Sequence, residues 1–178
     1  GIRYITKALI HNSTLKTLVL HHCGIIGKNV HYFADMLCKN NSLQRLNLSN
    51  NLIHKKAHLI IESLKSNSTL TSLRMSSICA KNSLLKKIAE ALKINTSLQI
   101  LDISYNLLSE SKYVVDILQN NSTLRELDIC LNSFESGHCD ILNVMRTNTS
   151  LESLLFDSDK NNLPHESHQL VTDILKYN

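Results

Sequence analysis

The sequence predicts an α/β solenoid in which short parallel strands alternate with helices, and three observations lead to this fold class. A motif of the form L-x-x-L-x-I-x-x-N, clearest in residues 98–106, recurs along the chain. Between its copies, apolar residues follow helical spacing. The first leucines of successive copies lie 28, 27, 28, 26 and 27 residues apart, at Leu15, Leu43, Leu70, Leu98, Leu124 and Leu151. One strand and one helix cannot bury their apolar faces alone, so units of this length stack on one another.

Each unit begins with a turn of the form N-x-[ST]-L. The six turns start at Asn12, Asn40, Asn67, Asn95, Asn121 and Asn148. Asparagine suits the left-handed backbone that ends many helices, and serine or threonine can bond nearby backbone. We therefore expect a helix to end and a strand to follow at each turn. These asparagines, with Asn120, also match the glycosylation sequence N-x-[ST], but recurrence at one structural position favours turn chemistry.

Within each strand, motif positions 1, 4 and 6 are predicted to face the core, as in Leu43, Leu46 and Leu48. The residue two beyond the Asn position is usually apolar as well: Ile25, Ile53, Leu108 and Phe134. Because helices pack farther apart than neighbouring strands, the stack should curve. The sequence thus predicts a parallel sheet on the concave face and helices on the convex face.

A single repeat domain is expected to span residues 1–178. Residues 1–11 resemble the helix of a preceding repeat, and six repeats start near residues 12, 40, 67, 95, 121 and 148. No polar cap is evident at either end, although solenoids usually need one. We therefore expect a fragment of a longer protein whose uncapped ends permit self-association.

Two repeats depart from the pattern. The third has Ile78 where the asparagine belongs, and isoleucine cannot satisfy the buried backbone groups of the loop. In the sixth repeat, residues 157–164 imply a two-residue insertion, after which Pro164 fits the first turn of a last helix. Both departures predict local irregularities in an otherwise regular stack.

Composition narrows the class of protein. The chain has 178 residues, of which 43% are hydrophobic, and a formal charge of +4. An odd number of cysteines, five, without paired spacing favours reduced thiols and a cytoplasmic location. No apolar run approaches the roughly 20 residues of a membrane helix. Lysines without interleaved aromatic residues indicate solvated helices, so we expect neither membrane nor nucleic-acid binding.

The residues at motif positions 3, 5 and 7 should line the concave face, and their charges separate along the array. Asp102 and Asp128 occupy the same motif position on neighbouring strands, so about 5 Å separates them and their repulsion costs about 3 kcal/mol at an effective dielectric of 20. A basic group of a protein partner would relieve this repulsion. The candidate binding residues are Arg45 and Arg74 early in the array, Asp102, Glu126, Asp128 and Asp157 late in it, and Tyr105 as an aromatic anchor. The alternative is that aspartate is simply frequent at this motif position.

Other chemistry finds little support in the sequence. His54 and His58 have the spacing of a zinc pair, but no third ligand accompanies them. Residues 157–168 imitate a calcium loop without its turn glycine or its bidentate glutamate. The adjacent His138 and Cys139 would not point at each other on a helix. We therefore expect no catalytic residues, no metal and no cofactor.

The repeats resemble the ribonuclease-inhibitor-like subfamily of leucine-rich repeats, whose Cys-Gly variant appears in Cys23-Gly24-Ile25. Turns such as residues 91–98 are similar to the arrays of NOD-like receptors. The resemblance implies a right-handed α/β horseshoe that binds a protein through its concave face, as the sensing domain of an intracellular receptor. Two alternatives remain: an architectural or oligomerisation segment of a larger assembly, and the repeat part of an intracellular bacterial effector.

Overall fold

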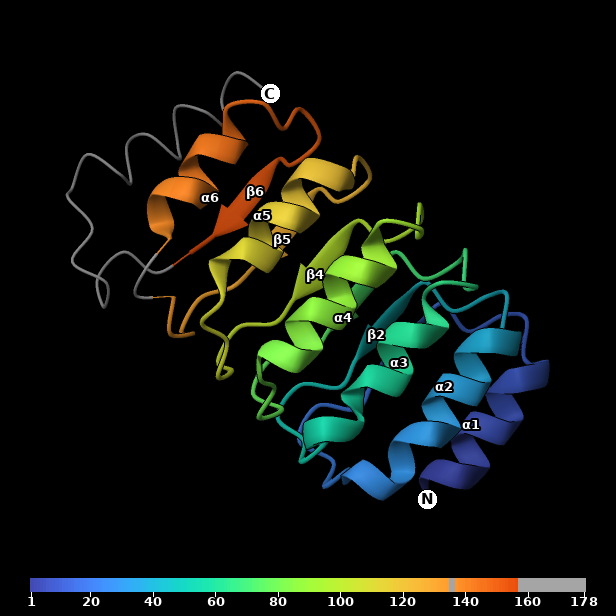
Figure 1. The fold of residues 1–178 in the computed structure, drawn as a ribbon. Coiled ribbons are helices and arrows are strands. Elements are labelled where there is room, and N and C mark those ends of the chain that lie inside the picture. The colour runs from blue at the N-terminus through green and yellow to red at the C-terminus, as the bar shows by residue number, and fades with distance from the viewer. Residues whose placement is uncertain (135–136, 157–178) are drawn as a thin grey trace.

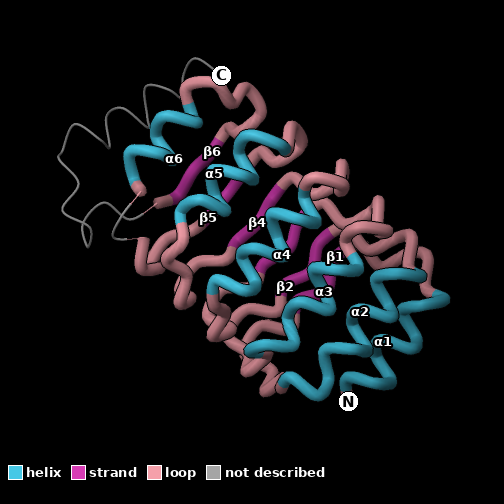
Figure 2. The backbone as a smooth tube through the Cα atoms, in the orientation of Figure 1, coloured by secondary structure: helices cyan, strands magenta, loops and turns pink. Residues whose placement is uncertain are grey.

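A computed structural model of the chain describes residues 1–134 and 137–156, and these form two layers (Figures 1 and 2). One layer is a six-stranded parallel sheet with the order β1-β2-β3-β4-β5-β6. Its strands are β1 (Thr17–Val19), β2 (Arg45–Asn47), β3 (Ser72–Arg74), β4 (Ile100–Asp102), β5 (Glu126–Asp128) and β6 (Ser153–Leu155). The other layer holds the helices α1 (Ile2–His11), η1 (Gly27–Asn29), α2 (Val30–Lys39), η2 (His54–Ala57), α3 (His58–Ser63), α4 (Asn82–Leu92), α5 (Ser111–Asn120) and α6 (His138–Met145). The predicted α/β repeat solenoid is therefore confirmed.

Every strand occupies motif positions 3 to 5, and the pairing register joins the same motif position of neighbouring repeats. Leu46, for example, pairs with Leu18 on one side and Leu73 on the other. Because the register repeats, equivalent side chains form rows across the sheet. The row at position 4 points into the core, whereas positions 3 and 5 alternate to the opposite face.

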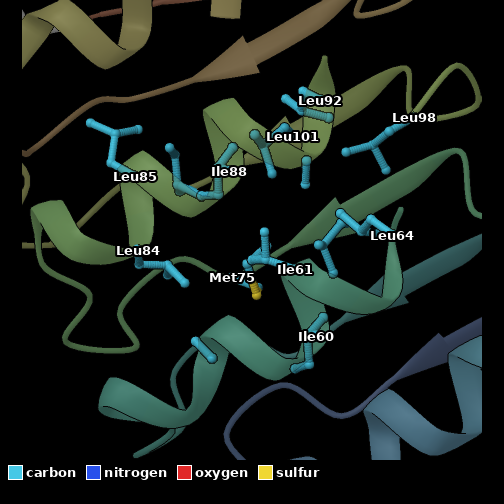
Figure 3. Close-up of a cluster of buried hydrophobic side chains, with 14 of the residues drawn as sticks. Ile60, Ile61, Leu64, Met75, Leu84, Leu85, Ile88, Leu92, Leu98 and Leu101 are labelled. Carbon is cyan, nitrogen blue, oxygen red and sulfur yellow. The ribbon is translucent and has the colours of Figure 1, made fainter. Parts of the chain in front are cut away.

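The core lies between the sheet and the helices (Figure 3). In α4, Leu84, Ile88 and Leu92 are buried in the core, as the helical spacing predicted, and Leu85 is buried with them. The apolar residues two beyond the Asn position are also buried: Ile25, Ile53, Leu108 and Phe134. Each repeat therefore shares its core with its neighbours, which agrees with the expectation that a lone unit is unstable.

The turn asparagines tie each repeat to the one before it. The Oδ1 atom of Asn95 accepts hydrogen bonds from the N–H groups of Ser97 (3.1 Å) and Leu98 (2.8 Å). Its Nδ2 atom donates to the carbonyls of Leu64 (2.8 Å) and Asn67 (2.9 Å) in the preceding repeat. The same pattern recurs at Asn40, Asn67, Asn121 and Asn148. These five asparagines are buried, which supports the interpretation of the sequons as turns.

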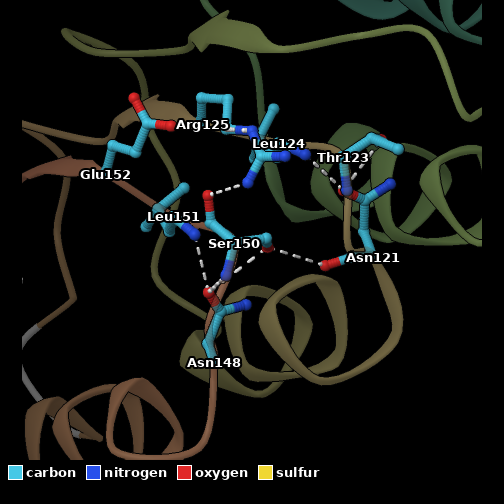
Figure 4. A network of polar contacts seen from close by, with 8 residues as sticks. All are labelled: Asn121, Thr123, Leu124, Arg125, Asn148, Ser150, Leu151 and Glu152. Carbon is cyan, nitrogen blue, oxygen red and sulfur yellow. Dashed lines mark hydrogen bonds and ion pairs between the residues drawn. The ribbon is translucent and has the colours of Figure 1, made fainter. Parts of the chain in front are cut away.

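Two successive turns of this ladder are drawn in Figure 4. Arg125 adds a bond from its Nη1 atom to the carbonyl of Ser150 (2.7 Å) and an ion pair with Glu152 (3.7 Å). The prediction of a left-handed backbone at the turn asparagines is wrong, because Asn40 and Asn121, with φ of −83° and −116°, are extended. The extended backbone leaves the amide free to reach both its own turn and the neighbouring one.

The left-handed backbone occurs instead at motif position 8. There φ lies between 52° and 56° in five repeats, at His22, Asn50, Ser77, Tyr105 and Leu131. For residues other than glycine this conformation costs roughly 1–2 kcal/mol. Its recurrence shows that the bend leading from strand to loop requires it, whatever side chain is present.

The loop asparagines at motif position 9 form a second ladder. Asn106 donates to the carbonyls of Met75, Ile103 and Ser104 and accepts from the N–H groups of Ile78 and Ala80. The loop of the third repeat is thus satisfied by the following repeat, and the expectation that Ile78 leaves it unsatisfied is wrong. The missing acceptor instead affects the loop of the second repeat, because the residue that would bond it from the third repeat is Ile78 and not an asparagine.

Several predictions concern residues outside the described part of the chain. They are the two-residue insertion, the last helix beginning at Pro164, the comparison of residues 157–168 with a calcium loop, and the site residue Asp157.

Replacing Asn95 with alanine should lower the free energy of unfolding by about 2–4 kcal/mol, because buried N–H and carbonyl groups of two repeats lose their partners. Urea denaturation followed by circular dichroism measures the change. Asn120→Ala is the matched control, since the exposed Asn120 side chain bonds only Asp116 one turn away. Equal stability of the two variants would contradict the role assigned to the ladder.

Candidate functional site

The candidate site is the sheet face opposite the helices, where the side chains at motif positions 3 and 5 are at least partly accessible except for the buried Ser72. Arg45, Arg74 and Glu126 are exposed, and Asp102 and Asp128 are partly exposed. The short strands hold these side chains in rows, because each strand pairs with its neighbours in one register. Arg45 is further fixed by a hydrogen bond from its Nε atom to the Thr17 hydroxyl oxygen, at 2.9 Å.

Two shallow hollows divide this face. The first, of about 230 Å³, lies over β1 to β4 and includes Thr17, Val19, Arg45, Asn47 and Arg74 in its lining. The second, of about 150 Å³, includes Arg74, Asp102, Glu126, Asp128 and Leu155. The structure therefore brings the predicted charged residues together as two adjoining groups, one basic and one acidic, with Arg74 bordering both.

The acidic pair is less isolated than the sequence suggested. Asp102 pairs with Asp128 on one side, as predicted, but it pairs with Arg74 on the other. The repulsion between the two carboxylates is thus partly offset by a guanidinium on the adjacent strand. The face has a boundary between opposite charges rather than an uncompensated acidic patch.

Position 5 also has a structural role. The Oδ1 atom of Asp102 accepts hydrogen bonds from the Ser104 N–H (3.1 Å) and the Ser104 hydroxyl (2.7 Å). Asp128 accepts from the Cys130 N–H at 3.0 Å, and Asn47 accepts from the Ser49 N–H at 2.9 Å. Because asparagine serves equally at this position, the bond requires an oxygen and not a charge. The charge of Asp102 and Asp128 is therefore separable from their part in the fold.

Tyr105 lies beyond the end of β4, in the left-handed position of its repeat, and its side chain is 59% exposed. It belongs to the lining of neither hollow. On the same edge, the sequence interpretation missed the exposed Leu52 and Leu107. It also left Val19 and Leu155 out of the site, although both are more than half exposed in the hollows. The sequence signal for Val19 and Leu155 was an apolar residue at motif position 5, which faces away from the core.

The structure offers no support for a metal site or a membrane span among the described residues. His54 begins η2 with a φ of 50° and His58 begins α3, so the two histidines are not on one α-helix as the sequence suggested. Within residues 1–134 and 137–156, no three His, Cys, Asp or Glu side chains gather as a metal site. No helix in that part of the chain is long and apolar enough to cross a membrane.

Comparison with known sequences identifies the repeat. The family model described as Leucine Rich Repeat matches residues 42–67. NACHT, LRR and PYD domains-containing protein 14 of Mus musculus is 27% identical over 99% of this chain, and protein 13 of Homo sapiens is 27% identical over 86%. Protein 4E of Mus musculus is 32% identical over 80% of the chain. The aligned regions are 18%, 15% and 12% of these relatives, so the chain spans less than a fifth of their length.

Two solved structures share the fold. A Caenorhabditis elegans tropomodulin C-terminal domain superposes with a TM-score of 0.71 at 15% identity, over 83% of this chain and 91% of that one. Leiomodin-1 actin-binding site 2 superposes with a TM-score of 0.60 at 17% identity, over 98% and 86%. Together, the recurring motif, the stacked sheet and these relatives show that the chain is a leucine-rich-repeat array, similar to those of the NACHT, LRR and PYD domains-containing proteins.

Proposed function

We propose that this chain is a non-catalytic module that binds a protein partner through the concave sheet. The observation that carries the proposal is the charge division of that face. Arg45 lines one hollow, Asp102, Glu126 and Asp128 line the next, and Arg74 borders both. A complementary partner would place acidic groups over the first hollow and basic groups over the second. Opposite charges arranged in this way fix the register of a partner and speed its association.

The dimensions and rigidity of the sheet support this function. Six parallel strands span roughly 25 Å, which suits an interface of about 800 Å² on each partner. The side chains are ordered by the paired backbone and by bonds such as that of Arg45 to Thr17. A preordered surface loses little conformational entropy on binding.

The similar proteins support a particular type of parent protein for this module. The relatives carry the repeats together with the NACHT and PYD domains in their names, and the solved leiomodin-1 structure is described as an actin-binding site. We propose that this chain is the partner-sensing repeat region of a cytoplasmic receptor of this type, with Tyr105 at the margin of the binding surface. The outward-facing Val19 and Leu155 would add apolar contacts.

A second candidate function is self-association through α1 and β1. On α1 and β1, Tyr4 and Val19 are 75% and 59% exposed, respectively, and Ile5 is 39% exposed. Exposed apolar side chains of this kind can join neighbouring copies in a larger assembly. Sedimentation velocity should then show mass rising with concentration, and Tyr4→Lys/Val19→Lys should abolish the rise; a strictly monomeric wild-type chain would contradict it.

Reversing the acidic charges with Asp102→Lys/Asp128→Lys should weaken partner binding by at least about tenfold, because basic groups of the partner then meet like charges. The measurement is quantitative mass spectrometry of proteins retained from a cytosolic extract, followed by titration with the purified partner. Asp35→Lys/Asp116→Lys is the control on the convex helices, with the same change of charge. A partner retained equally by both double variants would exclude the concave site.

The charge and the fold can be separated at position 102. Asp102→Asn should change the free energy of unfolding by less than about 0.5 kcal/mol, because the amide oxygen still accepts the Ser104 bonds. Asp102→Ala should lower it by about 1–2 kcal/mol, because those donors lose their acceptor. Equal unfolding midpoints in urea for the two variants would show that the Oδ1 bonds contribute nothing to the fold.

A further inference from the structure

A hollow of about 560 Å³ lies away from the concave sheet, among the loops that lead from β2 and β3 into the helices. We call it the loop hollow. Its lining consists of Gly27, Ile53, His54, Lys55, Lys56, His58, Cys79, Lys81, Ser83, Leu84 and Lys87. Volumes of 300–1,000 Å³ are typical of sites for small ligands. The hollow occurs at the boundary where Ile78 interrupts the ladder of loop asparagines.

The interruption leaves a backbone donor without a partner. At the equivalent positions of other repeats, the N–H groups of Ile25, Ala80 and Leu108 donate to a loop asparagine at 2.9, 2.9 and 3.1 Å. The N–H of Ile53 has no acceptor among the described residues, although Ile53 is fully buried. A buried N–H without a partner costs about 1–3 kcal/mol. Ile53 also belongs to the lining of the hollow, so the destabilised loop adjoins it.

The same hollow concentrates positive charge. Lys55, Lys56 and Lys81 line it, and none of the ion pairs found among the described residues involves them. The lining contains no aspartate or glutamate. The stem of Lys56 lies close to Gly27, where an added Cβ atom would be 3.3 Å from its Cγ atom, so Gly27 allows η2 to approach the preceding repeat.

Lys87 differs from these three lysines. Its Nζ atom lies 2.8 Å from the Glu90 Oε2 atom and 3.6 Å from the Glu62 Oε1 atom. The hydrogen bond to Glu90 raises the pKa of Lys87 above its usual value. Its charge is therefore already matched, and three cationic side chains remain to be neutralised.

We propose that the loop hollow binds a small organic phosphate, with the phosphate held by Lys55, Lys56 and Lys81 and an apolar body seated against Ile53 and Leu84. A phosphate monoester carries a charge of about −1.5 to −2 and three acceptor oxygens, which suits three lysines better than a single carboxylate does. The two buried side chains, of which Leu84 appears at the beginning of α4 in Figure 3, supply the apolar floor. The three lysines surround one local hollow and do not form a continuous basic track, which favours a small phosphate over a nucleic-acid polymer.

Phenyl phosphate is the probe, because it combines one phosphate with one apolar ring. Nuclear magnetic resonance titration of the ¹⁵N-labelled chain should shift the Ile53 amide resonance on binding. Lys55→Gln/Lys56→Gln/Lys81→Gln should weaken binding by at least about tenfold. The control Lys7→Gln/Lys16→Gln/Lys86→Gln removes the same charge from exposed positions outside the hollow and should bind within about twofold of the wild type. Circular dichroism confirms that both variants are folded.

The cysteines provide a second readout within one molecule. Cys79 lines the hollow and is exposed, whereas the exposed Cys38 lies elsewhere. At ten times its Kd, phenyl phosphate should slow alkylation of Cys79 by iodoacetamide about tenfold and leave that of Cys38 unchanged. Equal binding by the two triple variants, or no Ile53 shift and no Cys79 protection at millimolar ligand, would overturn the proposal.

The apolar floor and the source of the ligand are tested separately. Inorganic phosphate should bind at least about tenfold more weakly than phenyl phosphate, since it cannot use Ile53 and Leu84; equal affinity would overturn the assignment of the floor. N-acetyl-phosphotyrosine amide and adenosine monophosphate share the proposed chemistry. Tighter binding of the first would support a phosphorylated partner segment, and tighter binding of the second would support a free nucleotide.

Discussion

Hydrogen bonding of asparagine amides across repeat boundaries is the interaction on which the rest of this structure depends. A three-residue strand makes few backbone bonds of its own, and a short helix leaves its last carbonyls without partners. The Asn95 side chain supplies partners to both. Its oxygen accepts hydrogen bonds from its own turn, and its nitrogen donates to the helix end of the preceding repeat. An amide suits this position because it offers an acceptor and two donors on one short side chain.

The ladder also explains why the concave face can present ordered charges. With the turns fixed, each strand enters the sheet in the same register, and equivalent side chains align. Arg74, Asp102 and Asp128 thus become neighbours although about 26 to 28 residues separate them in the sequence. At Asn47, Asp102 and Asp128 the position-5 side chain supplies an oxygen acceptor whether or not it is charged, so charge can change at these three positions without loss of the hydrogen bond.

The loop hollow shows what happens where the second ladder is interrupted. Asn51, Asn106 and Asn132 each cover the loop of the preceding repeat, whereas Ile78 cannot cover the loop that contains Ile53. The isoleucine keeps the core filled, being fully buried, but it removes the acceptor. Regular repeats are thus suited to stability. The irregular boundary provides a hollow whose lining includes Ile53, with no acceptor for its N–H among the described residues, and three lysines outside the ion pairs found there.

Much of this architecture was determined by the sequence alone. The 26–28-residue period, the leucines at positions 1 and 4 and the turn asparagines are local patterns, and they predict the strands, their parallel order and the buried faces. The candidate residues Arg45, Arg74, Asp102, Glu126 and Asp128 also follow from the motif position, since alternation decides which side chains leave the core.

Only the tertiary structure decided how these residues are paired. Three findings are relations between repeats: Arg74 adjoins Asp102, Asn106 rather than Ile78 bonds the third loop, and the Ile53 N–H finds no acceptor within residues 1–134 and 137–156. The left-handed backbone likewise lies at position 8, where residues as different as His22, Ser77 and Leu131 accept it because the bend between strand and loop demands it. A pattern within one repeat shows which side chains are present. Hydrogen bonds and charges, however, act between neighbouring repeats, whose contacting residues are far apart in the sequence.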